Sequence, residues 1–154
     1  MSNILQGLKA VAVKRQKHLS PIARRRIKLV ASIYQQIAAA EARQDGRQHT
    51  IKRLRRILNK QTGERIEIAK DVKVRESWWS ADDGKFYLEI RYGYKPLEFS
   101  KGKTTVEIGE FGNLVPTLEI IRQATELGEF DAQLEAASSR LGEQLKARKV
   151  TKTK

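Results

Sequence analysis

The sequence predicts an α+β fold in which a basic N-terminal helix precedes an antiparallel meander sheet of four to five strands and two C-terminal helices. Three observations support this class. Apolar residues recur at helical spacing between residues 20 and 44, alternate with polar residues between 72 and 108, and return to helical spacing after residue 114. We expect a single α+β domain over 20–147, a basic arm over 1–19 and a disordered basic tail over 148–154.

The first helix is expected to begin at Ser20, a good N-cap residue, followed by Pro21 at the first helical position. It should end near Gln44, where Asp45 and Gly46 form a conventional stop. The early turns carry four cations, although the helix dipole favours anions at that end. These cations, whose placement indicates a role other than helix stability, are Arg24, Arg25, Arg26 and Lys28.

A second basic cluster lies in the segment 51–70, which we interpret as a β-hairpin around the turn Gln61-Thr62-Gly63-Glu64. A short helix over 50–59 is the alternative that the pattern leaves open. The cations of this cluster are Lys52, Arg53, Arg55 and Arg56.

The stretch 72–108 predicts the meander. A strand over 86–92 alternates apolar and polar residues, a second strand contains Leu97 and Phe99, and a third covers 104–108. Turns are expected at Asp82-Asp83-Gly84 and at Lys101-Gly102-Lys103. Connections this short favour antiparallel pairing.

Two helices are expected to close the chain. The first covers 114–127, with Pro116 in its first turn, Leu127 among its apolar residues and Gly128 as its stop, and it should cover one face of the sheet. The second covers about 131–147 and carries an apolar stripe from Leu134 to Leu145.

Composition excludes several classes of protein. The chain has no cysteine, so it has neither disulfides nor thiolate metal sites. No apolar run approaches the roughly 20 residues of a membrane span, and the N-terminus lacks the cleavage site of a secretory signal. We therefore expect a cytoplasmic protein without membrane contact. The acid-free N-terminus also resembles a transit peptide, but it runs directly into the first helix pattern, which favours a basic arm.

The net charge of +13 is concentrated in one half of the 154-residue chain. Residues 1–75 contain 19 Lys/Arg and 5 Asp/Glu, a net charge of +14, and the first acid is Glu41. Residues 76–130 carry −4 and residues 131–154 carry +3. A one-sided field of this kind concentrates polyanions, among which nucleic acid is abundant in cytoplasm. We expect the eight cations of the two basic clusters to contact phosphates.

Aromatic residues interleaved with cations favour single-stranded nucleic acid, because rings stack on unpaired bases while cations follow the backbone. The aromatic candidates are Trp78, Trp79, Tyr87, Tyr92 and Tyr94. Of these we expect Trp78, Trp79 and Tyr87 to stack on bases, together with Arg91. Adjacent tryptophans on a strand point to opposite faces, so at most one of the two enters the core.

Catalytic residues are sparse, and we expect neither an enzyme nor a cofactor or metal. His18 and His49 lie in basic polar segments without neighbouring carboxylates, as solvated histidines do. The minor alternative is a metal-dependent nuclease. Asp82-Asp83 followed by Glu89-Ile90-Arg91 loosely matches the acids and cation of restriction-endonuclease sites, although that family usually has Lys where Arg91 stands.

Most of the chain resembles an uncharacterised family of short bacterial and phage-associated proteins, a domain of unknown function. This resemblance implies a bacterial or prophage setting and no particular activity. The segments that carry it are LSPIARRRIKL (19–29), TGER (62–65), WWSADDGK (78–85), IRYGYKPLEFSKGK (90–103), LVPTLE (114–119) and GEFDAQLEAAS (128–138).

A partial resemblance covers 84–127, where GKFYLEIRYGYKPLEFSKGKTTVEI and LVPTLEIIRQATEL look like the purine-rich-element-binding (PUR) repeat and the related Whirly-type folds. It implies a curved antiparallel sheet, a following helix, single-stranded DNA or RNA as ligand, and a dimer. The strand turn of that family is replaced here by residues 91–96, and the sheet block is acidic, so phosphate contacts would come from the N-terminal half.

The leading hypothesis is a nucleic-acid-binding accessory protein that prefers single-stranded DNA or RNA without sequence specificity. The alternative is a phage or prophage protein that docks on a host protein complex through its basic helix and its C-terminal helix. A homodimer is compatible with either, because a small sheet has edges to pair.

Overall fold

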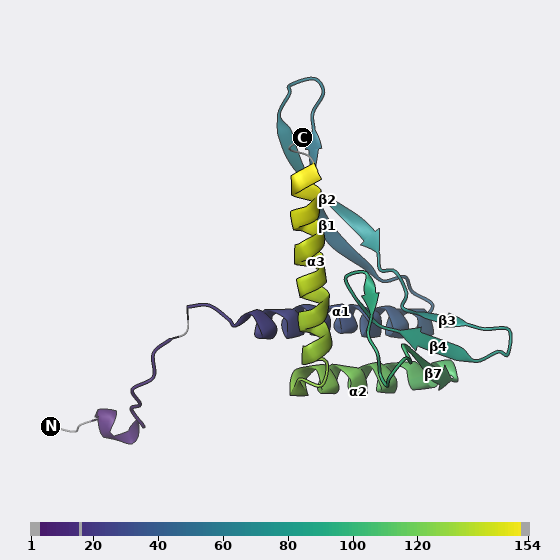
Figure 1. The fold of residues 1–154 in the computed structure, drawn as a ribbon, viewed down its shortest axis with the longest axis horizontal. Coiled ribbons are helices and arrows are strands. Elements are labelled where there is room, and N and C mark those ends of the chain that lie inside the picture. Colours follow the sequence, from purple (N-terminus) through teal and green to yellow (C-terminus); the bar gives the residue numbers. More distant parts are fainter. Residues whose placement is uncertain (1–3, 16, 152–154) are drawn as a thin grey trace.

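A computed structural model describes residues 4–15 and 17–151 and shows mixed α and β structure (Figure 1). The helices are η1 (Ile4–Gly7), α1 (Pro21–Gln44), η2 (Phe111–Asn113), α2 (Leu114–Leu127) and α3 (Asp131–Thr151). The strands are β1 (Thr50–Leu58), β2 (Arg65–Lys73), β3 (Trp78–Ser80), β4 (Phe86–Glu89), β5 (Arg91–Tyr92), β6 (Lys95–Pro96) and β7 (Thr105–Gly109). The α+β class expected from the sequence is confirmed.

Helix α1 has the predicted limits. The Ser20 hydroxyl accepts a hydrogen bond from the Ala23 amide at 3.3 Å, and Pro21 occupies the first turn. The Asp45 amide closes the helix by donating to the carbonyl of Glu41. The sequence signals for both ends were therefore sufficient, because capping depends on local residues.

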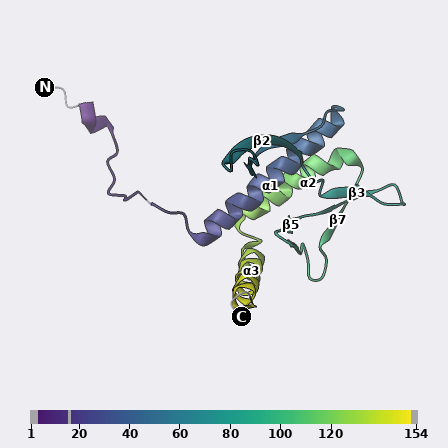
Figure 2. The same ribbon diagram turned by 90° about the horizontal axis from the view of Figure 1, so that it is seen from above.

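The core lies between the α1–α2 pair and the small sheet of β3, β4 and β7. Leu29 and Ile33 of α1 meet Leu118 and Ile121 of α2, all of them buried. The sheet adds Trp78, Leu88 and Ile108, and Phe130 and Leu134 close the end where α3 begins. Figure 2 shows α1 and α2 side by side, with β3 and β7 beside α2.

The strands form three small antiparallel sheets rather than the single meander expected. Their orders are β1–β2, β3–β4–β7 and β5–β6. The long strand expected over 86–92 breaks at Ile90, because the chain turns back at Gly93, whose φ is +64°. The strand expected around Leu97 and Phe99 is irregular: Leu97 is buried in the core, and beyond Phe99 a bridge joins Ser100 to Lys103.

The β1–β2 hairpin, hereafter the ribbon, confirms the β interpretation of 51–70 over the helical one. Its register pairs Thr50 with Lys73 and Leu58 with Arg65. The ribbon contributes no residue to the buried core among the residues described, and Figure 1 shows it rising away from α1. Within its two strands, only the base is partly covered, at Ile51 and Val72.

Gln36 of α1 anchors the chain where it leaves the ribbon. This buried amide donates to the Arg75 carbonyl at 2.9 Å and accepts from the Ser77 amide at 3.0 Å. Both polar groups of the side chain are thereby satisfied, which is what allows an amide to lie in a core.

Helix α3 is longer than expected and leaves the body after its first turns. It continues through Thr151, so residues 148–151 of the expected tail are helical, and 152–154 lie outside the described residues. Leu134 is buried, whereas Leu141 and Leu145 are 45% and 52% exposed. In α2, Leu127 is also exposed, contrary to expectation, because Leu114, Leu118, Ile121 and Thr125 form the buried face.

Residues 4–15 of the expected basic arm extend away from the body and are exposed (Figure 1). Within the described part of the chain, no helix is both long enough and apolar enough to cross a membrane.

Gly128 generates the first prediction. It ends α2 with φ +88°, and an added Cβ would lie 2.6 Å from Nη2 of Arg26 and 2.9 Å from Oδ2 of Asp131. Gly128→Ala should therefore lower the free energy of unfolding by about 1–2 kcal/mol from the left-handed backbone alone. Urea denaturation measures the change.

Gly142→Ala is the matched control for this substitution. Gly142 lies inside α3 with open space around its Cα, so alanine there should stabilise by about 0.5–1 kcal/mol. Equal effects of the two substitutions would contradict the role assigned to Gly128.

Candidate nucleic-acid interface

A stripe of α1 carries cations toward the ribbon. Arg24, Lys28, Ala31 and Gln35 are spaced by three or four residues and so share one side of the helix. None of the four is acidic. Arg24 and Lys28 are exposed, and the Arg24 Nε also donates to the Leu19 carbonyl at 3.1 Å.

One face of the ribbon, hereafter the inner face, is also free of acids. Alternation places on it eight residues between Ile51 and Val72, of which three are cations and five are aliphatic. Arg53 lies directly opposite Lys70, and Arg55 lies opposite Ile68. All three cations are exposed.

The α1 stripe and the inner face meet at the base of the ribbon. Ala31 and Gln35 of α1 line one cavity of about 450 Å³ together with Ile51, Arg53 and Val72 of the ribbon. Figure 2 shows the ribbon passing over α1. We call the combined surface the basic concave surface; its cations are Arg24, Lys28, Arg53, Arg55 and Lys70.

The remaining cations expected at phosphates have other surroundings. Arg26 forms a bidentate ion pair with Asp131: Nε donates a hydrogen bond to Oδ1 at 2.8 Å, and Nη2 donates a second one to Oδ2. Arg56 pairs with Glu67 at 2.8 Å on the outer face of the ribbon, where Lys52 stands opposite Asp71. These three are therefore close to acids, which reduces their attraction for phosphate. Arg25 is half-buried beside the stripe.

The four residues expected to stack on bases do not form one surface. Trp78 is only 3% exposed and meets the Phe111 ring edge-on, so its indole is not accessible to a base. Trp79 is 44% exposed and stacks on Tyr87, with ring centroids 6.2 Å apart. One tryptophan in the core is what strand alternation predicted.

Tyr87 and Arg91 are held by acids. The Tyr87 hydroxyl donates to Oδ2 of Asp83 at 2.6 Å, which lowers the pKa of Asp83 and raises the pKa of Tyr87. Arg91 pairs with Glu89 at 2.7 Å. Trp79 and Arg91 do line one cavity of about 340 Å³, but Glu76 and Glu89 line it too. This face therefore attracts anions less than the basic concave surface does.

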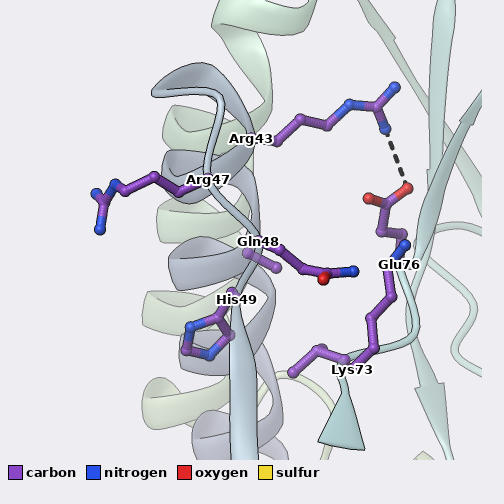
Figure 3. Close-up of a pocket in the computed structure, with 8 residues that line it drawn as sticks. Arg43, Arg47, Gln48, His49, Lys73 and Glu76 are labelled. Atoms are coloured by element: carbon purple, nitrogen blue, oxygen red, sulfur yellow. Dashed lines mark hydrogen bonds and ion pairs between the residues drawn. The ribbon is translucent and has the colours of Figure 1, made fainter.

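A second basic pocket of about 390 Å³ lies at the base of the ribbon, beside the C-terminal end of α1 (Figure 3). Its cations do not converge. Arg43 is joined to Glu76 at 3.0 Å, and Arg47 points away from the pocket and pairs with Asp45 at 2.6 Å. His49 is half-buried and its Nε2 lies 2.8 Å from Oε1 of Gln35.

The acids of the nuclease alternative are not assembled. Asp83 accepts from the Lys85 amide within its own turn, and Glu89 is engaged by Arg91 and Thr104. Among the residues that the structure describes, no group of three or more histidines and acids is placed to hold a metal ion.

Lys70 is the residue that sequence reasoning missed. It stands alone in an otherwise unremarkable segment, and only the strand register places it beside Arg53. Counting outward from the expected turn at 61–64 places Lys70 on the same face as Arg53 but opposite Arg55, so the sequence signal gave the face and not the observed pairing.

The chain belongs to a family of unknown function: the model described as Family of unknown function (DUF6641) matches residues 1–134. This confirms the resemblance to an uncharacterised domain. No curated protein and no solved structure matches the chain. The bacterial or prophage setting and the likeness to the PUR repeat stay predictions.

The Arg26–Asp131 pair generates the second prediction. The hydrogen bond from Arg26 lowers the pKa of Asp131, so the unfolded chain binds this proton more tightly than the folded one. The stabilisation is complete above an ordinary Asp pKa of about 3.9 and is lost as the pH falls through the folded value. Asp131→Asn should therefore destabilise the protein at pH 7 and have a progressively smaller effect below about pH 4.

Urea denaturation of both proteins between pH 2.5 and 7 checks this. Other acids titrate in both proteins and cancel in the difference. A stability difference that stays constant over the whole range would show that the charge of Asp131 is not what matters.

Proposed function

We propose that this member of the family binds nucleic acid without sequence specificity, through phosphate contacts made by the basic concave surface. The proposed activity is binding without catalysis. The observation that carries it is that five exposed cations lie on one side of α1 and one face of the ribbon, that neither of these contains an acid, and that the two meet at one cavity.

The physical basis is electrostatic. A concave surface with charge of one sign focuses its field, and the release of counterions from phosphates drives association. The exposed residues 4–15 add Lys9, Lys14 and Arg15 to the same sign of charge. Phosphates are alike along any sequence, so contacts of this kind carry no sequence information.

The preference for single strands, which rested on stacking, now depends on Trp79. Its exposed ring stacks on Tyr87, so a base would have to add to an existing stack or displace it. The phosphate-binding part of the proposal does not depend on this ring.

The salt dependence of binding generates the third prediction. The five cations and one further cation of the arm would neutralise about six phosphates. Raising the salt concentration from 50 to 200 mM should then lower the affinity for nucleic acid by about 10³. Replacing Arg24, Lys28, Arg53 and Arg55 by Gln should reduce the slope of log K against log salt by about 0.9 for each phosphate that the variant no longer neutralises. Fluorescence anisotropy with labelled DNA and RNA measures both quantities.

The control variant removes the same charge elsewhere. Lys101, Lys103, Arg140 and Lys146 are exposed cations outside the basic concave surface, and their replacement by Gln also lowers the net charge from +13 to +9. If both variants lose affinity equally, net charge alone drives binding and the surface is not the site.

The exposed stripe of α3 supports a second candidate function, docking on a protein partner. Leu141 and Leu145 lie one turn apart and are half-exposed, in a helix that leaves the body after Leu134. Exposed apolar side chains at helical spacing are a common mode of protein recognition.

The fourth prediction separates the two functions. Leu141→Gln with Leu145→Gln should abolish capture of a protein partner by the immobilised protein and leave the affinity for nucleic acid unchanged. The control is Arg24→Gln with Arg53→Gln, which should weaken nucleic-acid binding and leave capture of the protein partner unchanged. Loss of both activities in the leucine variant would indicate that α3 belongs to a single shared surface.

A further inference from the structure

We infer that the ribbon lies in the major groove of B-form DNA, with its inner face toward the bases and the α1 stripe on the flanking phosphates. This inference rests on the proposed function, and it names the form of nucleic acid that the same surface takes.

The dimensions of the ribbon fit this groove. The B-form major groove is about 12 Å wide and 8.5 Å deep and admits a two-stranded β-ribbon. Neighbouring strands lie about 4.8 Å apart, and the six residues from Arg53 to Leu58 extend about 20 Å beyond the base at about 3.3 Å per residue. The ribbon therefore reaches across the groove while its base stays attached to α1.

The ribbon is built to leave the body. Between Lys52 and Asp71, Asn59 is the one residue that is not exposed, although each strand has nine residues. Both faces are open to solvent, and only Ile51 and Val72 pack toward α1. A ribbon that is free of the body on both faces can enter a groove, whereas a ribbon packed against the body cannot.

The charge and the side-chain types of the ribbon both point to DNA as its ligand. The ribbon carries eight cations and three acids over residues 50–73, a net charge of +5, and the three acids lie outside the inner face. The outer half of the inner face is aliphatic, with Ile57 opposite Ile66. Major-groove edges offer hydrogen-bond acceptors and thymine methyl groups, which suit arginine and isoleucine side chains. In the groove, Arg53 and Arg55 would therefore exchange the phosphate contacts of the proposed function for base contacts, which add a sequence preference to the binding by Arg24 and Lys28.

Other forms of nucleic acid fit less well. A-form RNA has a deep, narrow major groove that side chains do not reach, so double-stranded RNA would meet the ribbon only at its phosphates. Single strands offer no groove, and of the two tryptophans expected to stack on bases Trp78 is buried and Trp79 is already stacked on Tyr87. The geometry therefore favours duplex DNA over both.

The experiment compares one sequence as duplex DNA, duplex RNA and single-stranded DNA at one salt concentration, with fluorescence anisotropy. Duplex DNA should bind at least about tenfold more tightly than duplex RNA. Its advantage over single-stranded DNA should exceed the roughly tenfold that the difference in counterion release supplies for about five phosphates at about 0.1 M salt. No binding to any probe overturns the proposed function itself. Binding to all three with similar affinity overturns the groove inference and leaves the proposed function standing.

A shortened ribbon tests the element directly. Replacing residues 54–69 by Asn-Gly joins the paired residues Arg53 and Lys70 through a two-residue turn, and lowers the net charge by two. The matched control, Arg140→Gln with Lys146→Gln, lowers it by the same amount outside the ribbon. In the shortened variant, the preference for duplex DNA should fall to the ratio that counterion release alone supplies. In the charge-matched control, the preference should remain that of the native protein.

A modified duplex provides a readout that needs no variant. Bulky sugar groups attached at cytosine C5 fill the major groove and leave the phosphates unchanged, so they should weaken binding of the native protein at least about tenfold. Equal affinity for modified and unmodified duplexes would overturn the inference, whatever the shortened variant does.

Discussion

The two hydrogen bonds of the Gln36 side chain fix the ribbon to the rest of the protein. The amide is buried in α1 and engages the carbonyl of Arg75 and the amide of Ser77, which flank the passage from β2 to β3. An unsatisfied buried amide costs about 1–3 kcal/mol, so this arrangement has few competitors. It sets the point at which the ribbon leaves α1. The position of Arg53 relative to Lys28 depends on that point.

The core closes without the ribbon, and this separation explains the composition of residues 50–73. Leu29, Ile33, Leu118 and Ile121 bury one another between the two long helices, and β3, β4 and β7 complete the core. The residues of the ribbon beyond its base are therefore not needed to fill the core, so they do not have to be apolar. Its dense positive charge would be a liability in a packed element, and it is tolerated because the ribbon stands in solvent. The same separation leaves the surface of α1 that faces the ribbon available for cations.

Local signals predicted the fold better than they predicted the interface. The ends of α1 and α2 followed from Ser20, Pro21 and Gly128, whose effects act within a few residues. The single meander was wrong because alternation cannot show where a strand stops pairing, and Gly93 turns the chain back. The ion pair of Arg26 joins residues 105 positions apart, so no spacing rule could separate Arg26 from its neighbours Arg24 and Lys28.

The ribbon has one more consequence, for the behaviour of the protein in concentrated solution. In the described part of the chain β1 and β2 pair only with each other, so each strand has an outer edge of unpaired backbone groups. Such edges recruit strands from other molecules, and exposed Leu54, Leu58 and Ile66 would favour such stacking. Repulsion between the cations of neighbouring copies opposes this self-association. The charge proposed to attract a polyanion would then also act as a gatekeeper against aggregation.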